Sequence, residues 1–415
     1  MILKIKGKNQ IQGEIDIYGA KNSAVSIIPA AILCDGVVTI RNIPDISDVR
    51  IMLEILTDIG YDVTFNSHIV TIKKNRKPSW VIRNTKATSL RGSYYFYGAM
   101  LSQFKKVSSF LPGGCKLGSR PIDYHLEVFK SLNCSYKIKD NIITIKTRKL
   151  KANTINLPYP SVGATINAIL ASCKAKGTTY ITNYAREPEV IDTINFLKSM
   201  GSIIKITSDR LEITGVKRLN PTDYTIICDR IEAGSYLLMG CIKKFKYLTV
   251  NNVDASLLTS VLDVILKIGG RYEITNNSIT VFPPEVVKAI NLETGPYPGF
   301  PTDLAQVLTV ILLQDEATSS ITEKIFSDRF SHIYELSKMK ANITLDGATY
   351  QITGGSKLTK ADMEASDLRG AFSLVCASLL VNAFSTISNI EVIFRGYNDF
   401  FNNLDKLKLN YSIIE

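Results

Sequence analysis

The chain has 415 residues, of which 45% are hydrophobic and 21% are charged, and its formal net charge is +11. This length and composition are typical of a globular protein with two or three domains, each able to bury a core. The lysines are scattered singly or in short pairs, such as Lys105-Lys106 and Lys243-Lys244, without a basic stripe, so we expect no nucleic-acid partner.

Cysteine and histidine usage argues against a metal centre. The seven cysteines form no CxxC pair and show no regular ligand spacing, and only three histidines occur, so we expect neither a metal nor another cofactor. The longest apolar tract, residues 371–383, is too short to span a bilayer, and the N-terminal residues alternate like a strand without a signal-peptide core. These features predict a cytoplasmic protein without a membrane span, either a monomer or a weak homo-oligomer.

One pattern recurs six times along the chain: a strand, an amphipathic helix and then two short strands. A clear copy has a strand at 179–183, a helix at 190–200, Gly201 as its stop signal, and strands at 203–206 and 211–213. The six helices are expected to end near residues 60, 133, 201, 270, 340 and 409, a period of roughly 70 residues.

Each copy also has an opening half, in which a strand leads into an apolar helix. We expect a strand at 15–18 to open the first copy and a strand at 224–227 to open the fourth. The helices that follow, such as 166–173 and 371–383, are apolar on most faces and belong inside a core. Six βαβαββ repeats therefore predict an α/β fold of two domains, with sheets outside and helices inside.

The domain boundaries follow from how the repeats close. The sixth copy ends after one strand, near residues 411–414, whereas its siblings have two. The chain begins with a lone strand at 2–6, which we expect to complete the last repeat. One domain then comprises residues 20–229, and the other comprises residues 1–19 plus 230–415.

Charged side chains gather at the expected helix starts, where free N–H groups and the helix dipole favour anions. Lys21 and Arg91 are examples, Asp303 occupies the equivalent position in the fifth repeat, and Asp367 and Arg369 occupy it in the sixth. Arginines with a lysine suggest a ligand that carries phosphate and carboxylate. Aspartates beside them suit proton transfer.

A further feature is the loop at residues 111–125, in which Cys115 follows two glycines and is flanked by Lys116 and Arg120. Nearby cations stabilise a thiolate, so the loop can present a reactive sulfur to an anionic ligand. A surface turn with an incidental cysteine explains the local residues equally well.

Several short motifs together give the chain a family resemblance along essentially its full length. They are Gly19-Ala20-Lys21-Asn22, Leu111-Pro112-Gly113-Gly114-Cys115, Pro160-Ser161-Val162-Gly163, Arg186-Glu187-Pro188-Glu189, Phe300-Pro301-Thr302-Asp303, Asp367-Leu368-Arg369 and Arg395-Gly396-Tyr397. With them the chain resembles the UDP-N-acetylglucosamine 1-carboxyvinyltransferases, the enolpyruvyl transferases of early peptidoglycan synthesis. The resemblance implies a two-domain inside-out α/β barrel, in agreement with the repeat.

The resemblance also implies an activity: transfer of the enolpyruvyl group of phosphoenolpyruvate to the 3′-hydroxyl of UDP-N-acetylglucosamine, with release of phosphate. It implies catalytic roles for Lys21, Cys115, Asp303, Asp367 and Arg395. It implies substrate-binding roles for Asn22, Arg91, Arg120, Pro121, Ile122, Asp123, Tyr124, Ser161, Val162, Gly163, Asp303, Arg329 and Arg369. The family's loop cysteine also makes these enzymes targets of the epoxide fosfomycin.

Two other readings stay open at this point. The chain could be a catalytically weak or regulatory paralogue of that enzyme. It could instead be a 3-phosphoshikimate 1-carboxyvinyltransferase, which shares the fold but does not use a loop cysteine, so that Cys115 argues against this assignment.

Overall fold

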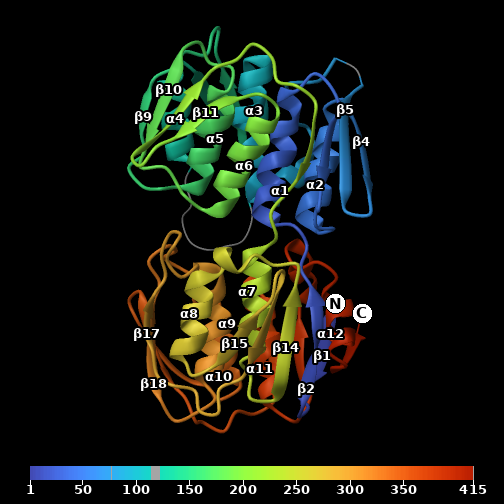
Figure 1. The fold of residues 1–415 in the computed structure, drawn as a ribbon, viewed down its shortest axis with the longest axis vertical. Coiled ribbons are helices and arrows are strands. Elements are labelled where there is room, and N and C mark those ends of the chain that lie inside the picture. Colours follow the sequence, from blue (N-terminus) through green and yellow to red (C-terminus); the bar gives the residue numbers. More distant parts are fainter. Residues whose placement is uncertain (76, 114–121, 415) are drawn as a thin grey trace. The chain divides into compact units, whose positions relative to one another are not determined.

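The computed structural model describes residues 1–75, 77–113 and 122–414. Their contacts divide the chain into two compact units, each a mixture of helices and strands (Figure 1). We call residues 1–18 and 228–414 the terminal unit, because it holds both chain ends, and the described part of residues 19–227 the inserted unit.

The inserted unit contains three repeats. Its helices are α1 (Lys21–Ala30), α2 (Ser47–Asp58), α3 (Tyr95–Phe104), α4 (Asp123–Ser131), α5 (Val162–Ser172) and α6 (Pro188–Ser199), with short 3-10 helices η1 (Ala31–Leu33), η2 (Thr85–Thr88) and η3 (Arg91–Tyr94). Its strands are β3 (Val38–Arg41), β4 (Tyr61–Asn66), β5 (Ile69–Lys74), β6 (Lys106–Phe110), β7 (Ser135–Lys139), β8 (Ile142–Lys146), β9 (Thr154–Asn156), β10 (Thr178–Thr182), β11 (Ile203–Ile206), β12 (Arg210–Thr214) and β13 (Thr222–Thr225). The strands form sheets in the orders β13-β3-β5-β4, β6-β8-β7 and β11-β12-β10-β9.

The terminal unit contains the other three repeats. Its helices are α7 (Arg230–Met239), α8 (Thr259–Lys267), α9 (Thr302–Leu312), α10 (Ser331–Lys338), α11 (Leu368–Leu380) and α12 (Phe400–Lys406), with η4 (Ala255–Leu257) and η5 (Ile390–Arg395). Its strands are β1 (Ile2–Lys6), β2 (Ile11–Asp16), β14 (Phe245–Asn251), β15 (Arg271–Ile274), β16 (Ser278–Phe282), β17 (Asn291–Glu293), β18 (Thr318–Thr322), β19 (Asn342–Asp346), β20 (Thr349–Thr353), β21 (Asp362–Glu364), β22 (Ser385–Ser388) and β23 (Asn410–Ile414). The sheet orders are β15-β16-β14-β2, β17-β18-β20-β19 and β21-β22-β1-β23.

The strand pairing confirms the predicted repeat, except that the sheet of the second copy has three described strands instead of four. In the third copy β9 and β10 run parallel, and β12 pairs antiparallel with both β10 and β11. The β17–β20 sheet repeats this arrangement in the terminal unit. Gly60, Gly201 and Gly269 end their helices with φ of 107°, 95° and 94°, which only glycine adopts readily.

The N-terminal strand completes the sixth repeat, as predicted. β1 lies between β22 and β23 and pairs antiparallel with both, with Ile2 opposite Ser388 and also opposite Ile414. The two chain ends therefore belong to one sheet, and the labels N and C lie together in Figure 1.

The predicted opening strands of the first and fourth repeats are wrong in their sheet assignment. Strand β2 pairs parallel with β14, in the sheet of the fourth repeat, with Ile15 opposite Val250. Strand β13 pairs parallel with β3, in the sheet of the first repeat, with Tyr224 opposite Ile40. The two opening strands are thus exchanged, because the chain passes from one unit to the other directly after each of them.

Each unit has its own hydrophobic core, built around three central helices. These are α1, α3 and α5 in the inserted unit, and α7, α9 and α11 in the terminal unit. Every residue of α7 is buried, and so is α9 from residue 304 to 312. A helix that is apolar on most faces is stable only inside a core, so polar side chains are confined mainly to its ends.

Candidate active site

Acidic side chains lie at the N-terminal ends of the three central helices of the terminal unit. Asp229 caps α7 and accepts two backbone N–H hydrogen bonds at 2.9 Å each. Asp367 caps α11 in the same way, at 2.9 and 3.2 Å. Asp303 is the second residue of α9. Arg329 interacts electrostatically with Asp303 and Asp367, and Arg369 with Asp303 and Asp229, so the unit brings these carboxylates to one end of the helix group.

Asp303 forms ion pairs with two buried arginines. Its Oδ1 lies 2.5 Å from Nη1 of Arg329, and its Oδ2 lies 3.6 Å from Nε of Arg369, which is beyond hydrogen-bond distance. Both arginine side chains are 3% exposed, whereas Asp303 is 27% exposed. Burial alone would lower the pKa of Arg329, but its attraction to Asp303 and Asp367 raises it, so the guanidinium stays charged.

The two arginines keep donors that no group among the described residues accepts from. Nε of Arg329 and both Nε and Nη1 of Arg369 are buried and have no hydrogen-bond acceptor among the described residues. A buried donor without an acceptor typically costs about 1–3 kcal/mol. Arginine donors suit planar or tetrahedral oxyanions, so this end of the terminal unit favours a carboxylate or phosphate ligand.

Tyr397 and Glu232 lie near Arg369, and Arg395 ends the neighbouring η5. The Tyr397 ring lies 5.0 Å from the guanidinium, and Arg395 ends η5 two residues earlier, where it is half-buried. Glu232, in the first turn of α7, is buried and accepts a hydrogen bond from the backbone N–H of Asn398 at 3.1 Å. Burial and the nearby Asp229 raise the pKa of Glu232 well above its usual range.

In the inserted unit, the lysine at the start of α1 has a buried partner. Nζ of Lys21 lies 2.7 Å from Oδ2 of Asp48, and the side chains are 12% and 3% exposed. Asn22 follows on the same helix, and its backbone carbonyl accepts a hydrogen bond from Ser26 at 3.1 Å. Asp48 lies in the first turn of α2. Many polar residues occupy helix starts in this chain, so the sequence pattern alone does not single Asp48 out.

Around Tyr94 the inserted unit brings two other predicted residues together. The Arg91 guanidinium lies 5.7 Å from the centre of the Tyr94 ring, and the His125 ring lies 4.4 Å from it. A Cβ added to Gly163 would lie 2.6 Å from the Tyr94 hydroxyl and 2.9 Å from His125 Cε1, so a larger residue requires these rings to shift. Burial, aided by Arg91, lowers the pKa of His125 to about 3. Nδ1 of His125 lies at a hydrogen-bond distance of 2.8 Å from the side-chain nitrogen of Asn167.

The remaining predicted residues lie at helix starts of the same unit. Ser161 caps α5, accepting from the Ala164 N–H at 3.4 Å, and Val162 is the first residue of that helix. Ile122 directly precedes α4, and Asp123 and Tyr124 are its first, exposed residues.

Cys115, Arg120 and Pro121 lie outside the described residues, and their roles stay predictions. Of the predicted set, the structure brings Asp303, Arg329, Arg369 and Asp367 together in the terminal unit. Among the residues described, no group of three or more His, Cys, Asp or Glu side chains is placed to hold a metal ion.

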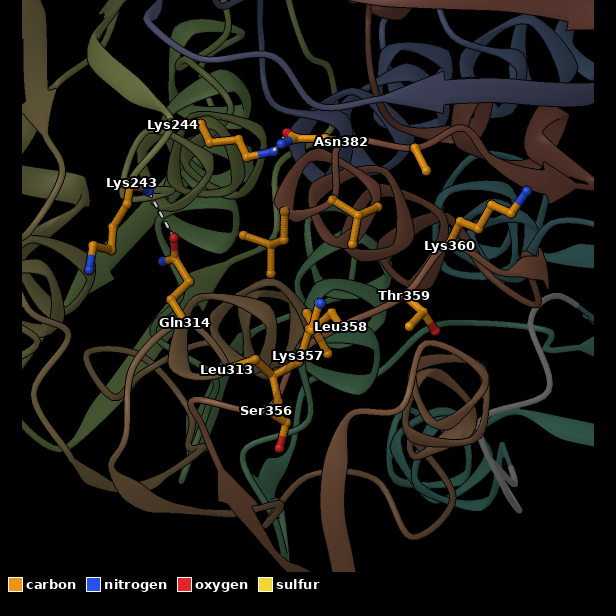
Figure 2. Close-up of a pocket in the computed structure, with 13 residues that line it drawn as sticks. Lys243, Lys244, Leu313, Gln314, Ser356, Lys357, Leu358, Thr359, Lys360 and Asn382 are labelled. Atoms are coloured by element: carbon orange, nitrogen blue, oxygen red, sulfur yellow. Dashed lines mark hydrogen bonds between the residues drawn. The ribbon is translucent and has the colours of Figure 1, made fainter.

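A separate pocket lies at the opposite, C-terminal ends of the same central helices (Figure 2). Its volume is about 960 Å³, and four lysines line it: Lys243, Lys244, Lys357 and Lys360. Lys243 pairs with Asp315 at 2.7 Å, and Lys244 donates to Asn382 at 2.6 Å. Cations beside helix C-termini offset the partial negative charge of the last carbonyls, which gives these lysines a structural explanation.

The fold and the charged helix starts define a class: a two-unit α/β protein of six repeats whose central helices carry charged side chains at their N-terminal ends. A family model for EPSP synthase (3-phosphoshikimate 1-carboxyvinyltransferase) matches residues 5–404. The chain therefore belongs to the enolpyruvyl transferase family, and the expected inside-out α/β fold is confirmed.

Relatives and solved structures agree with this assignment. UDP-N-acetylglucosamine 1-carboxyvinyltransferase 2 of Geobacillus kaustophilus is 40% identical over 98% of this chain and 95% of its own length. UDP-N-acetylglucosamine 1-carboxyvinyltransferase of Streptococcus pneumoniae is 40% identical over 99% of both chains. The enolpyruvyl transferase NikO from Streptomyces tendae has the same fold, with a TM-score of 0.91 at 22% identity, and the match covers 99% of this chain and 98% of the NikO chain. EPSP synthase from Acinetobacter baumannii gives a TM-score of 0.78 at 17% identity, covering both chains completely.

Within the part of the chain that the structure describes, no helix is long and apolar enough to cross a membrane.

Proposed function

We propose that this protein transfers the enolpyruvyl group of phosphoenolpyruvate to the 3′-hydroxyl of UDP-N-acetylglucosamine and releases phosphate. The observation that carries the choice of substrates is the match, at about 40% identity and over nearly the whole chain, to relatives named for this reaction. Such a reaction would commit UDP-N-acetylglucosamine to peptidoglycan, and hence to cell-wall growth and division.

The chemistry requires a base at the attacking hydroxyl and an acid at the methylene carbon. Asp303 is the proposed base, because its carboxylate lies at the start of α9 and is paired with two arginines. Asp367 is proposed to lie close to the reacting centre. Arg329, Arg369 and Arg395 supply preorganised donors for the carboxylate and phosphate of the substrates, and such donors need little reorganisation as charge develops.

The inserted unit contributes the other proposed contacts. Lys21 binds the phosphate of phosphoenolpyruvate together with Arg120, and Asn22 orients the sugar. Residues 120–123 and the α5 start at Ser161, Val162 and Gly163 hold the uridine and diphosphate. Arg91 steadies the anionic substrates, and Tyr124 is a further substrate contact. Helix N-termini favour phosphate, which supports this placement. Cys115 is the proposed acid at the methylene carbon, and it also forms the covalent adduct with phosphoenolpyruvate.

The direct test is phosphate release by the purified protein. We expect release only when phosphoenolpyruvate and UDP-N-acetylglucosamine are both present, and none when either is left out. Release with shikimate 3-phosphate as the acceptor would replace the proposal by the 3-phosphoshikimate reaction. A folded protein that releases no phosphate with either acceptor would instead be a silent paralogue.

We also propose that residues 20–229 and residues 1–19 plus 230–415 act as two domains, and that the enzyme works in the cytoplasm as a monomer or weak homo-oligomer. The six described cysteines are all free thiols, which supports a reducing compartment. Light scattering coupled to size exclusion measures the oligomeric state.

A further inference from the structure

A buried glutamate connects three segments of the terminal unit. Glu323 directly follows β18 and is 6% exposed. Its Oε1 accepts hydrogen bonds from the Thr294 hydroxyl at 2.9 Å and from the backbone N–H groups of Ile325 and Phe326 at 2.7 and 3.1 Å. Its Oε2 accepts from the Thr302 hydroxyl at 2.7 Å. The carboxylate thus joins the end of β17, the start of α9 and the loop before α10.

The contact with Thr302 extends to the candidate base. Because the Thr302 hydroxyl donates its only proton to Glu323, its oxygen is left to accept, and Nη1 of Arg329 donates to it at 3.1 Å. The same Nη1 lies 2.5 Å from Oδ1 of Asp303. One guanidinium nitrogen is therefore held between the hydroxyl and the candidate catalytic carboxylate.

We propose that Glu323 and Thr302 are positioning residues, which orient the Arg329 guanidinium so that it holds the Asp303 carboxylate in place. This rests on the proposed function for the role of Asp303 as base. Neither residue needs to touch substrate. Their effect passes through Arg329, whose loop is tied to Glu323 by two backbone hydrogen bonds and whose guanidinium lies 5.3 Å from the Phe326 ring.

The geometry explains why the hydroxyl and the carboxylate act together. A charged acceptor makes a stronger hydrogen bond than a neutral one, so Glu323 fixes the direction of the Thr302 proton. Once that proton points to Glu323, Thr302 has none left to donate to Asp303. Arg329 is buried and cannot exchange this contact for water, so loss of the hydroxyl lets the guanidinium turn away from its present position.

The experiment compares Thr302→Val, which removes the hydroxyl at nearly constant volume, with Thr302→Ser, which keeps it. Phosphate release is measured against pH with both proposed substrates. We expect Thr302→Val to lower kcat by about 10- to 100-fold with a smaller change in KM, since small misplacements at a reacting group have effects of this size. Thr302→Ser should retain most of the activity.

The pH profile separates positioning from mere stability. A carboxylate that loses a paired cation binds its proton more tightly, so the acid limb of kcat/KM should move to higher pH by about one unit in Thr302→Val. Glu323→Gln should move it in the same direction, because the neutral amide is a weaker acceptor. Thr294→Val is the matched control, because it removes another hydroxyl donor to Glu323 whose described hydrogen bonds join Glu323 and the Lys324 N–H, and its acid limb should match the wild type.

The outcomes keep this inference apart from the proposed function. A wild type without activity overturns the proposed function. Crystal structures of the wild type and Thr302→Val then still test the positioning, because the pair between Arg329 and Asp303 should lengthen only in the variant. An active wild type whose acid limb and kcat equal those of Thr302→Val overturns the positioning role and leaves the function intact. So does an unchanged ion pair in the Thr302→Val crystal structure.

Discussion

His332→Gln should remove much of the acid sensitivity of the terminal unit. His332 lies on α10, is 2% exposed, and packs edge-on against Tyr350, with ring centres 5.7 Å apart. Its Nε2 lies 3.5 Å from the Thr309 hydroxyl, and its Nδ1 has no hydrogen-bond partner among the residues described. A protonated ring would place two N–H donors in this site, and the structure offers an acceptor near one of them.

The size of the effect follows from linkage. Burial lowers the pKa of His332 from its ordinary 6.5 to about 3, with Asp367 opposing and Arg329 adding to the shift. Between these values the unfolded chain binds a proton that the folded chain excludes, so stability is lost as the pH falls below 6.5. Each pH unit below the unfolded pKa costs about 1.4 kcal/mol, which gives roughly 2 kcal/mol between pH 8 and pH 5.

Urea unfolding followed by circular dichroism at pH 8 and pH 5 measures this difference. We expect the wild type to lose about 2 kcal/mol more than His332→Gln on acidification, and this double difference cancels the groups that both proteins share. His68→Gln, in a β-hairpin turn of the inserted unit, is the control and should follow the wild type. Equal pH dependence in wild type and His332→Gln would refute the reasoning, because the buried ring would then accept its proton in the folded state.

Three other perturbations test the site. Asp303→Asn should lower kcat of phosphate release by about 10²- to 10⁴-fold, because it removes the proposed base, while the protein stays folded by circular dichroism. Gly163→Ala should lower the free energy of unfolding by about 1–3 kcal/mol and raise KM for UDP-N-acetylglucosamine, because the added methyl overlaps Tyr94 and His125. Fosfomycin should alkylate Cys115, as read by mass spectrometry, and Cys115→Asp should escape labelling while keeping an acid in the loop.

A control variant or a contradicting result is defined for each of these three perturbations. Gly295→Ala adds the same methyl group where no atom lies within 4 Å, so a similar loss of stability there would mean that the Gly163 overlap is not the cause. Near-normal kcat in Asp303→Asn would assign the base to another group, with Asp367 the next to test. A fosfomycin label on any of the other six cysteines would contradict the special reactivity proposed for Cys115.

Most of the fold could be predicted from the periodic spacing of apolar residues in the sequence. Alternating strands, helical spacing of apolar residues and glycine stops are properties of a few neighbouring residues, so they predicted six repeats and the helices in each. The lone strand at 2–6 was also paired correctly with the last repeat, because that repeat lacked one strand. The candidate site was predicted in part, since helix starts such as those of Asp303, Asp367 and Arg369 can be read from the same patterns.

The sequence by itself thus determined the sixfold repeat, the order of its main helices and strands and which helices are central, because these depend on local spacing, although in the described part of the chain the sheet of the second repeat has three strands instead of four. Only the tertiary structure decided that β2 pairs with β14 and β13 with β3, since these parallel partners lie far apart in sequence and no local pattern records which strand lies beside which. The role of Glu323 was likewise revealed only by the tertiary structure. A single glutamate after a strand has no distinctive pattern, and its role depends on the folding that brings Thr294, Thr302 and the Arg329 loop around one carboxylate.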